Sequence, residues 1–139
     1  MVIADTSVWI TFQRDPRSAV GQEFDSLLAE DEVVMVGPVL AELLQGARSE
    51  SEFEFFRLHL TALSFLETDQ DTWARAGELN YRLREHGSML AFADLIIASL
   101  AMQHGIAVYT VDGDFGRVPG LALHEARSRY KDYPTQDSR

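Results

Sequence analysis

Short, continuous apolar runs alternate with longer amphipathic stretches along this chain. The apolar runs predict strands buried on both faces, at 2–4, 33–37, 64–67, 106–111 and 121–123. The amphipathic stretches predict helices, one beginning near Thr6 and ending at Asp15-Pro16, the others at 18–31, 38–46, 50–63, 69–86 and 89–103. Strands that alternate with helices indicate an α/β fold with a mainly parallel sheet covered on both faces.

The helix expected at 50–63 carries apolar residues on two opposite sides. At 100° per residue, these are Phe53, Phe56, Leu60 and Leu63 on one side and Phe55, Leu58 and Ala62 on the other. One sheet covers only one of the two sides. The second side is therefore expected to meet a partner, such as a second copy of the chain, unless both sides are buried within the same domain.

Composition narrows the class of protein. The 139 residues suit one domain over 1–139, with a polar, frayed tail from about 128 onward. There is no Cys, which excludes a disulfide framework, a Cys nucleophile and a Cys-ligated metal. No apolar run reaches the roughly 18 residues of a membrane span, and no basic region precedes the first apolar run, so we expect a cytoplasmic protein.

The charge is strongly acidic, with 22 Asp and Glu against 12 Lys and Arg, a formal net charge of −10. This argues against a protein that coats nucleic acid through a uniform basic surface. It leaves open a nucleic-acid enzyme whose acids are gathered in one metal site. The candidates for holding phosphates are Arg48, Arg82, Arg84 and Arg117, although each of them taken singly reads as ordinary surface arginine.

Four carboxylates stand out by position. Asp5 and Asp112 each follow a predicted strand directly, and Asp114 comes two residues later; if those strands are neighbours, their carboxyl ends share one crevice. Asp94 lies in an apolar helix that we expect to be buried, where an unpaired carboxylate is costly. The structural alternatives are a helix cap for Asp5 (unless Thr6 or Ser7 caps that helix), turn chemistry for Asp112 and Asp114, and a cap or Arg pair for Asp94.

Glu42, in the helix that begins at Pro38, is the fifth candidate, and its alternative is an exposed polar position. Acids that converge at one sheet edge repel one another unless a cation neutralises them. Mg²⁺ or Mn²⁺ suits an oxygen-only ligand set, and no His accompanies these acids, which argues against zinc. Two such ions about 4 Å apart are a recurrent device for phosphodiester hydrolysis.

The order and spacing of these acids resemble a known family. VIADTSVWI at 2–10 resembles the opening of PIN-domain ribonucleases, most closely VapC-type toxins of bacterial toxin–antitoxin pairs. The later motifs of that family resemble VLAELLQG at 39–46, ADLIIA at 93–98 and VYTVDGDF at 108–115. Each motif is weak alone, but all four occur in the family's order over essentially the whole chain.

The resemblance implies a three-layer α/β/α fold and Mg²⁺-dependent endoribonuclease activity, with metal-activated water as nucleophile. It implies that Asp5 and Asp94 are the central metal ligands, that Glu42 completes the cluster, and that Asp112 or Asp114 fills the last acidic position. Thr6, Ser7 and Thr110 are then candidate hydrogen-bond donors to these carboxylates. It also implies an RNA substrate and a VapB-like antitoxin as partner, and we expect a homodimer.

Two alternatives use the same acids differently. Receiver domains and haloacid-dehalogenase-like phosphatases also place acids at strand ends, but Asp5 has no acidic neighbour, Ser7 stands where the phosphatases need an acid, and the only Lys is Lys131. A catalytically silent PIN-fold binding module is the second alternative. Metal titration separates it from an enzyme, because a module without a working site gains little from Mn²⁺.

Overall fold

A four-stranded sheet forms the centre of the computed structural model, which describes residues 1–125. Its strands are β1 (Val2–Ala4), β2 (Val33–Val36), β3 (Ser64–Leu66) and β4 (Ala107–Tyr109), in the order β3-β2-β1-β4. All three strand pairs are parallel, with Ile3 opposite Val34 on one side and Val108 on the other. The parallel sheet predicted from the apolar runs is confirmed. The first strand pairs with the fourth, which is the condition under which Asp5 and Asp112 were expected to share one crevice.

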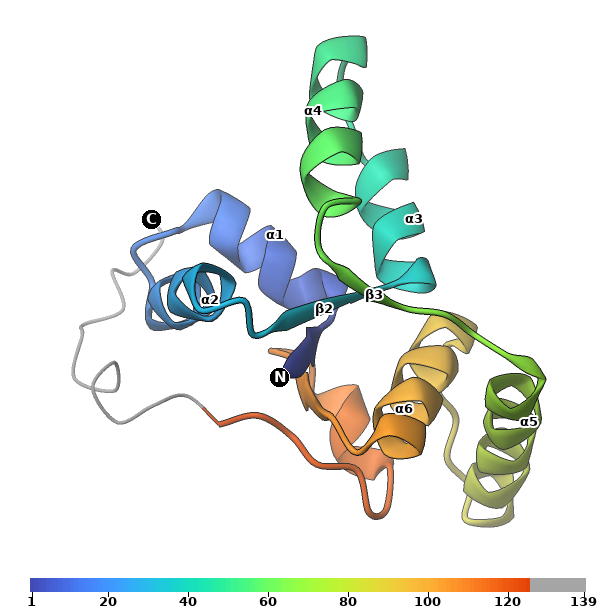
Figure 1. Ribbon diagram of the computed structural model, residues 1–139. Helices are drawn as coiled ribbons and strands as arrows, with labels where there is room; N and C mark the ends of the chain where they lie inside the picture. Colours follow the sequence, from blue (N-terminus) through green and yellow to red (C-terminus); the bar gives the residue numbers. More distant parts are fainter. Residues whose placement is uncertain (126–139) are drawn as a thin grey trace.

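Helices cover both faces of this sheet (Figure 1). They are α1 (Thr6–Arg14), α2 (Ala19–Ala29), α3 (Gly37–Gln45), α4 (Glu50–Leu60), α5 (Gln70–Glu85) and α6 (Phe92–His104), with a short 3-10 helix η1 (Gly113–Arg117). Side chains alternate along β1, so that Val2 and Ala4 pack with α1 and α2 while Ile3 packs with α6. The three-layer α/β/α arrangement is therefore present.

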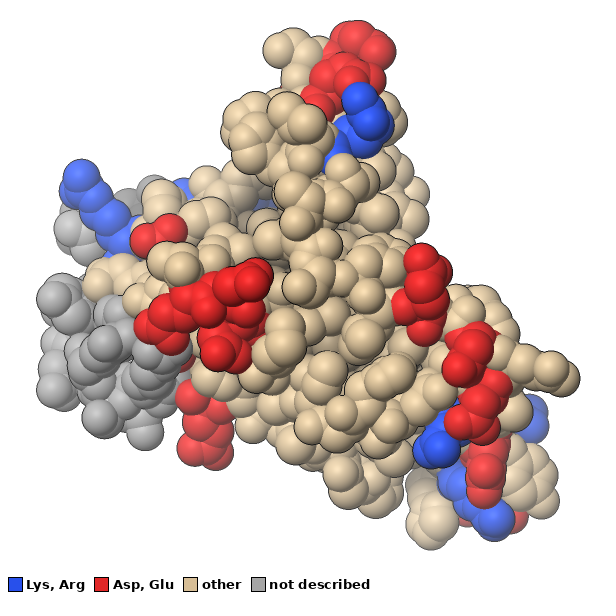
Figure 2. All heavy atoms as spheres, viewed as in Figure 1, with Lys and Arg blue, Asp and Glu red and all other residues tan. Residues whose placement is uncertain are grey.

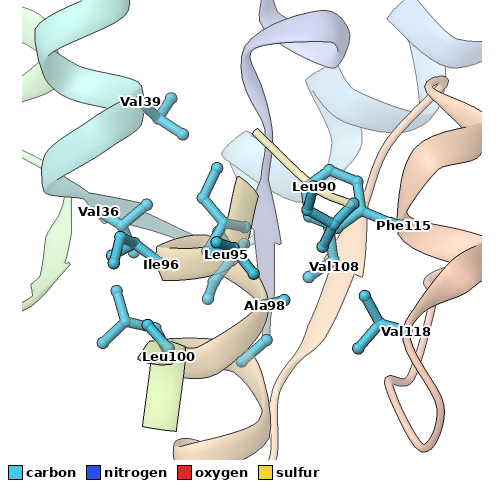
Figure 3. Close-up of a cluster of buried hydrophobic side chains, with 14 of the residues drawn as sticks. Val36, Val39, Leu90, Leu95, Ile96, Ala98, Leu100, Val108, Phe115 and Val118 are labelled. Atoms are coloured by element: carbon cyan, nitrogen blue, oxygen red, sulfur yellow. The ribbon is translucent and has the colours of Figure 1, made fainter. Parts of the chain in front are cut away.

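Helix α6 lies at the centre of the larger core. Figure 3 shows Leu95, Ile96, Ala98 and Leu100 of α6 among side chains from the sheet and from η1. All residues from Leu95 to Ala101 are buried, which is why this helix is apolar on nearly every side. This packing fixes the N-terminal end of α6, where Asp94 lies in the first turn.

Helices α3 and α4 project together from the sheet, at the top of Figure 1. Of the two apolar sides expected for this stretch, one packs inward through Phe56 and Leu60. On the other, Phe55 is 57% and Leu58 65% exposed, so the domain leaves that side uncovered within the described residues. Burial of both sides within the domain is therefore not observed among the described residues, and the partner expected on the open side stays a prediction.

Several boundaries differ from the predicted ones, among them the end of the helix expected at 50–63 and both ends of the strand expected at 106–111. Helix α6 begins at Phe92 rather than at Met89, because Leu90 is buried in a non-helical segment. Residues 121–123 form a single bridge, Val108 to Leu123, rather than a strand. The cap of α1 is Asp5, not Thr6 or Ser7. The polar tail expected from about 128 lies outside the described residues. Within the described part of the chain, no helix is long and apolar enough to cross a membrane.

Candidate metal centre

Asp5 stands where β1 ends and α1 begins, next to the end of β4. Its backbone N–H donates to the carbonyl of Tyr109 at 3.0 Å, which continues the β1–β4 pairing. Its Oδ1 accepts from the N–H of Val8 at 3.3 Å and from the Ser7 hydroxyl, and its Oδ2 accepts from the Thr110 hydroxyl at 2.7 Å. Asp5 is thus a helix cap, as the structural alternative held, and is also held towards the loop that follows β4.

Burial dominates the electrostatics of Asp5, which is only 5% exposed. It raises the pKa of the Asp5 carboxyl above its usual value, against the opposing effect of the hydrogen bonds from Ser7, Thr110 and Val8. The negative charge of Asp112 adds to this rise. A cation beside Asp5 would favour its charged form.

Asp94 lies in the first turn of α6, only partly buried. The sequence predicted a fully buried carboxylate; the later start of α6 instead places Asp94 at the mouth of the core. Its pKa is raised to about 6, first by burial and then by the negative charges of Asp5, Asp112, Glu42 and Asp114. Within residues 1–125 no group donates a hydrogen bond or an ion pair to it, so neither structural alternative for Asp94 is observed.

Asp112 and Asp114 lie in the turn after β4. The Oδ1 of Asp112 caps η1 by accepting from the N–H of Asp114 at 3.0 Å, and Asp114 forms an ion pair with Arg117 at 3.1 Å. One carboxylate oxygen from each of Asp94, Asp112 and Asp114 lies within 4.8 Å of the others. Asp112 therefore stabilises the turn, as the structural alternative held, and also belongs to the cluster. The cluster brings together three acids from two separate segments of the chain.

Glu42 approaches from α3. Its Oε2 accepts a hydrogen bond of 2.5 Å from the hydroxyl of Thr6, the first residue of α1. Glu42 and Asp5 lie outside the group of three acids within 4.8 Å, yet both raise the pKa of Asp94 through their charge. The other four predicted acids therefore all lie close enough for their charges to act on Asp94. Three of the five acids cluster within 4.8 Å, and the other two accept hydrogen bonds from hydroxyl groups.

The four arginines suggested as phosphate contacts lie in different parts of the structure. Arg48 lines a groove that also contains Thr6 and Glu42, and Arg117 pairs with Asp114 and donates to the carbonyl of Met89 at 3.2 Å. Arg82 and Arg84 lie on α5, where Arg82 pairs with acids of its own helix. Sequence reasoning missed Arg14, which lines the same groove as Arg48. Arg14 lies in the last turn of an amphipathic helix, and this position in the sequence does not indicate that it shares a groove with Arg48.

Comparison with known proteins identifies the fold family. The family model described as PIN domain matches residues 2–121. This chain belongs to the PIN domain family. Among curated proteins, this PIN domain is similar to the VapC ribonuclease Mb1587 of Mycobacterium bovis, with 28% identity over 92% of this chain and 98% of that protein.

Solved structures agree with the family assignment. This PIN domain superposes on VapBC2 from Rickettsia felis, solved bound to a promoter DNA fragment, with a TM-score of 0.73, 22% identity and coverage of 89% and 98% of the two chains. It superposes on FitAcB from Neisseria gonorrhoeae with a TM-score of 0.72, 26% identity and coverage of 91% and 98%. The family-model match over residues 2–121 spans the elements that carry all five acids.

The geometry of this PIN domain suits a hard cation. The clustered donors are carboxylate oxygens, which Mg²⁺ and Mn²⁺ prefer, and no His belongs to the group of three among the described residues. The pKa values of Asp5 and Asp94 are raised first by burial and then by neighbouring acids, so a bound cation would favour the charged form of both.

Proposed function

We propose that this chain acts as a single PIN domain with metal-dependent endoribonuclease activity. The observation that carries the proposal is the convergence of Asp94, Asp112 and Asp114 within 4.8 Å, beside Asp5 and Glu42. RNA is the proposed substrate because the curated relatives are named ribonucleases. Carboxylates in this arrangement serve phosphodiester hydrolysis in many nucleases.

We assign the metal site to the five acids. Asp94, Asp112 and Asp114 would hold the ion, and Asp5 and Glu42 would complete the site directly or through water. Bound Mg²⁺, or Mn²⁺ in its place, would supply water activation and charge neutralisation at the phosphate. The hydroxyl groups of Ser7 and Thr110 orient Asp5, and that of Thr6 orients Glu42. A carboxylate of the group would accept the proton of the attacking water.

The test is cleavage of total RNA with EDTA, Mg²⁺ or Mn²⁺, for the wild type and Asp94→Asn. We expect cleavage only with metal, and a loss of roughly a hundred-fold or more in the variant. Either ion should also raise the melting temperature of the wild type, through preferential binding to the folded state. Cleavage by Asp94→Asn at the wild-type rate would contradict the site assignment. A wild type that neither cleaves RNA nor gains stability from Mn²⁺ would support the silent binding module.

We further propose a VapB-like antitoxin as partner, because the structural relatives include VapBC complexes. An apolar groove of 550 Å³ lies between α1 and α4 and is lined by Trp9, Phe12, Phe55 and Phe56 among others. Aromatic and Leu side chains of an antitoxin segment fit this groove, and an Arg on the segment would complement the acids.

Substitution of Phe55 tests the groove. Phe55→Ala should weaken antitoxin binding by roughly ten- to a hundred-fold, as truncation of an anchor residue does, with RNA cleavage unchanged. Leu58→Ala is the matched control, because Leu58 is equally exposed on α4 but lies outside the groove lining. Equal antitoxin affinity for both variants would place the antitoxin elsewhere.

A homodimer is the last part of the proposal. Apolar side chains remain exposed outside the groove, among them Met89 and the stacked pair Trp73–Phe92, whose ring centroids are 6.2 Å apart. Burial of this area between two copies would stabilise a dimer. Sedimentation velocity at tens of micromolar protein measures the mass of the particle, and a strict monomer would contradict the proposed homodimer.

A further inference from the structure

A second groove, of 470 Å³, opens beside the candidate metal centre. It begins at Thr6 and Glu42, the hydrogen-bonded pair at the edge of the acidic group. Its walls come from α1, α3, α4 and the segment between α3 and α4, and they include Arg14, Arg48 and Glu52. Its volume lies within the range of sites that bind small ligands. The groove therefore shares Glu42 with the proposed metal site.

Arg14 and Arg48 have no acidic partner in the described part of the chain. Four other arginines do pair with a carboxylate three or four residues away, namely Arg57, Arg75, Arg82 and Arg117. Arg14 and Arg48 line one groove and leave two guanidinium groups there without an acidic partner among the described residues. Guanidinium groups bind phosphate through paired N–H donors, which makes phosphate the matching ligand class.

The position of these arginines separates them from the cut bond. Arg14 follows Thr6 by eight residues in α1, which corresponds to about 12 Å along the helix axis. Thr6 in turn holds Glu42 at the acidic group. A phosphate between Arg14 and Arg48 is thus distinct from the phosphate at the metal. Contacts at that distance hold the strand and leave the chemistry at the acids unaltered.

We propose that Arg14 and Arg48 form a phosphate-binding site that holds the RNA strand on the Glu42 side of the metal centre. The proposal rests on the proposed ribonuclease function. The two arginines are positioning residues, and they supply local attraction that the acidic surface as a whole lacks. Glu42 and Glu52 line the same groove, so the attraction is confined to the guanidinium groups.

An acidic peptide is the competing ligand, and the structure favours RNA. The polar groove shares Glu42 with the proposed metal site, where a phosphodiester must lie. A peptide with apolar anchors has the neighbouring apolar groove instead, which shares Gln13, Leu43 and Phe56 with the polar one. The two ligands therefore lie side by side, each on the surface that matches its chemistry.

The test measures the binding of a fluorescein-labelled single-stranded RNA by anisotropy over a series of salt concentrations. Arg14→Gln, Arg48→Gln and the double variant are compared in an Asp94→Asn background, which prevents cleavage during the measurement. Each lost phosphate contact should reduce the slope of log affinity against log salt by about 0.7. With Asp94 restored, KM for RNA should rise roughly ten-fold per substitution, as for a lost charged hydrogen bond, with kcat unchanged.

Arg84→Gln is the matched control, because Arg84 is exposed on α5, changes the net charge equally and lines none of these grooves. It should keep the wild-type slope, and unchanged melting temperatures should confirm that all variants fold. A double variant with wild-type slope and affinity would overturn the proposal. Loss of antitoxin affinity with intact RNA affinity would assign the groove to an acidic peptide and also overturn it. If the parent protein cleaves no RNA with metal present, the proposed function itself fails, whatever the arginines do.

Discussion

Asp5 combines two roles that respond differently to substitution. Its side chain caps α1, which Asn does about as well as Asp, and its charge belongs to the acidic group. A single position therefore contributes to stability through its shape and to the proposed metal site through its charge. The two contributions separate when the side chain is replaced by one that keeps only the first.

Two variants at position 5 test this separation. Asp5→Asn should abolish metal-dependent cleavage and leave the free energy of unfolding in EDTA equal or higher, since the cap remains and a buried charge is removed. Asp5→Ala should also abolish cleavage but lose about 1 kcal/mol of stability with the cap. Urea denaturation in EDTA measures both. Equal stability of the two variants would argue that the cap contributes nothing.

The raised pKa of Asp94, about 6, predicts how stability depends on pH. The same carboxyl in the unfolded chain titrates near 4, so between about pH 4 and 6 only the folded protein keeps the proton. The free energy of unfolding of the metal-free protein should therefore fall as pH rises through this window. A bound cation favours the carboxylate, so with saturating Mg²⁺ the stability should instead rise with pH.

Melting temperatures followed by circular dichroism, in EDTA and in Mg²⁺, measure this change of sign. Asp5, whose pKa is also raised, adds to the effect. The pKa of Asp69 is lowered by the N–H of Thr72 and by Gln103, so that group titrates below the window. Asp94→Asn should remove most of the pH dependence. If stability changed with pH in the same direction in EDTA and in Mg²⁺, the result would contradict metal binding by these acids.

At the scale of elements, the close approach of α2 to the end of α1 depends on Gly21. A Cβ atom at this position would lie 2.6 Å from the carbonyl oxygen of Asp15 and 2.7 Å from that of Pro16, both backbone atoms. Gly21→Ala should therefore lower the free energy of unfolding by roughly 1–3 kcal/mol, because the turn has to shift. Urea denaturation measures the change.

Gly77→Ala is the matched control for this substitution. Gly77 lies inside α5, and nothing comes within 4 Å of a Cβ atom there. Alanine should raise the stability by about 0.5–1 kcal/mol through helix propensity alone. Similar effects of the two substitutions would show that contact with residues 15 and 16 is not what requires glycine at position 21.

Elements differ in how far the sequence predicts them. The buried strands and the parallel sheet can be predicted from apolar runs between helices. Asp5 and Asp112 can be predicted as site residues because each directly follows such a run. The start of α6 was predicted too early, because Leu90 is buried without being helical and an apolar pattern does not separate the two states. Arg14 was missed because the groove is formed by segments that meet only in three dimensions.

At the scale of the whole molecule, the negative charge is spread over the surface and is not confined to the metal centre. On the face in Figure 2, acidic side chains form several separate patches and basic ones are few. A field of this sign attracts a basic segment and repels RNA at long range. The proposed antitoxin therefore has an advantage over substrate during approach, before any contact in the grooves forms.

This charge predicts a steep salt dependence of inhibition. The association rate of a basic antitoxin segment should fall markedly between low and physiological salt, because the Debye length shortens to about 8 Å. Stopped-flow fluorescence with the tryptophans as reporters measures this rate. The dissociation rate should change little and serves as the internal control. An association rate indifferent to salt would exclude steering and leave the site assignment intact.

The pairing of β1 with β4 also determines when during synthesis the protein could become active. Asp5 is made more than a hundred residues before its neighbour Thr110 and the acids at 112 and 114. The earlier helices can form as the chain leaves the ribosome, whereas the acidic group waits for β4 to dock beside β1. A growing chain therefore lacks the assembled centre until β4 and the segment that follows it have been made and have docked, so no competent nuclease forms on the ribosome before that point.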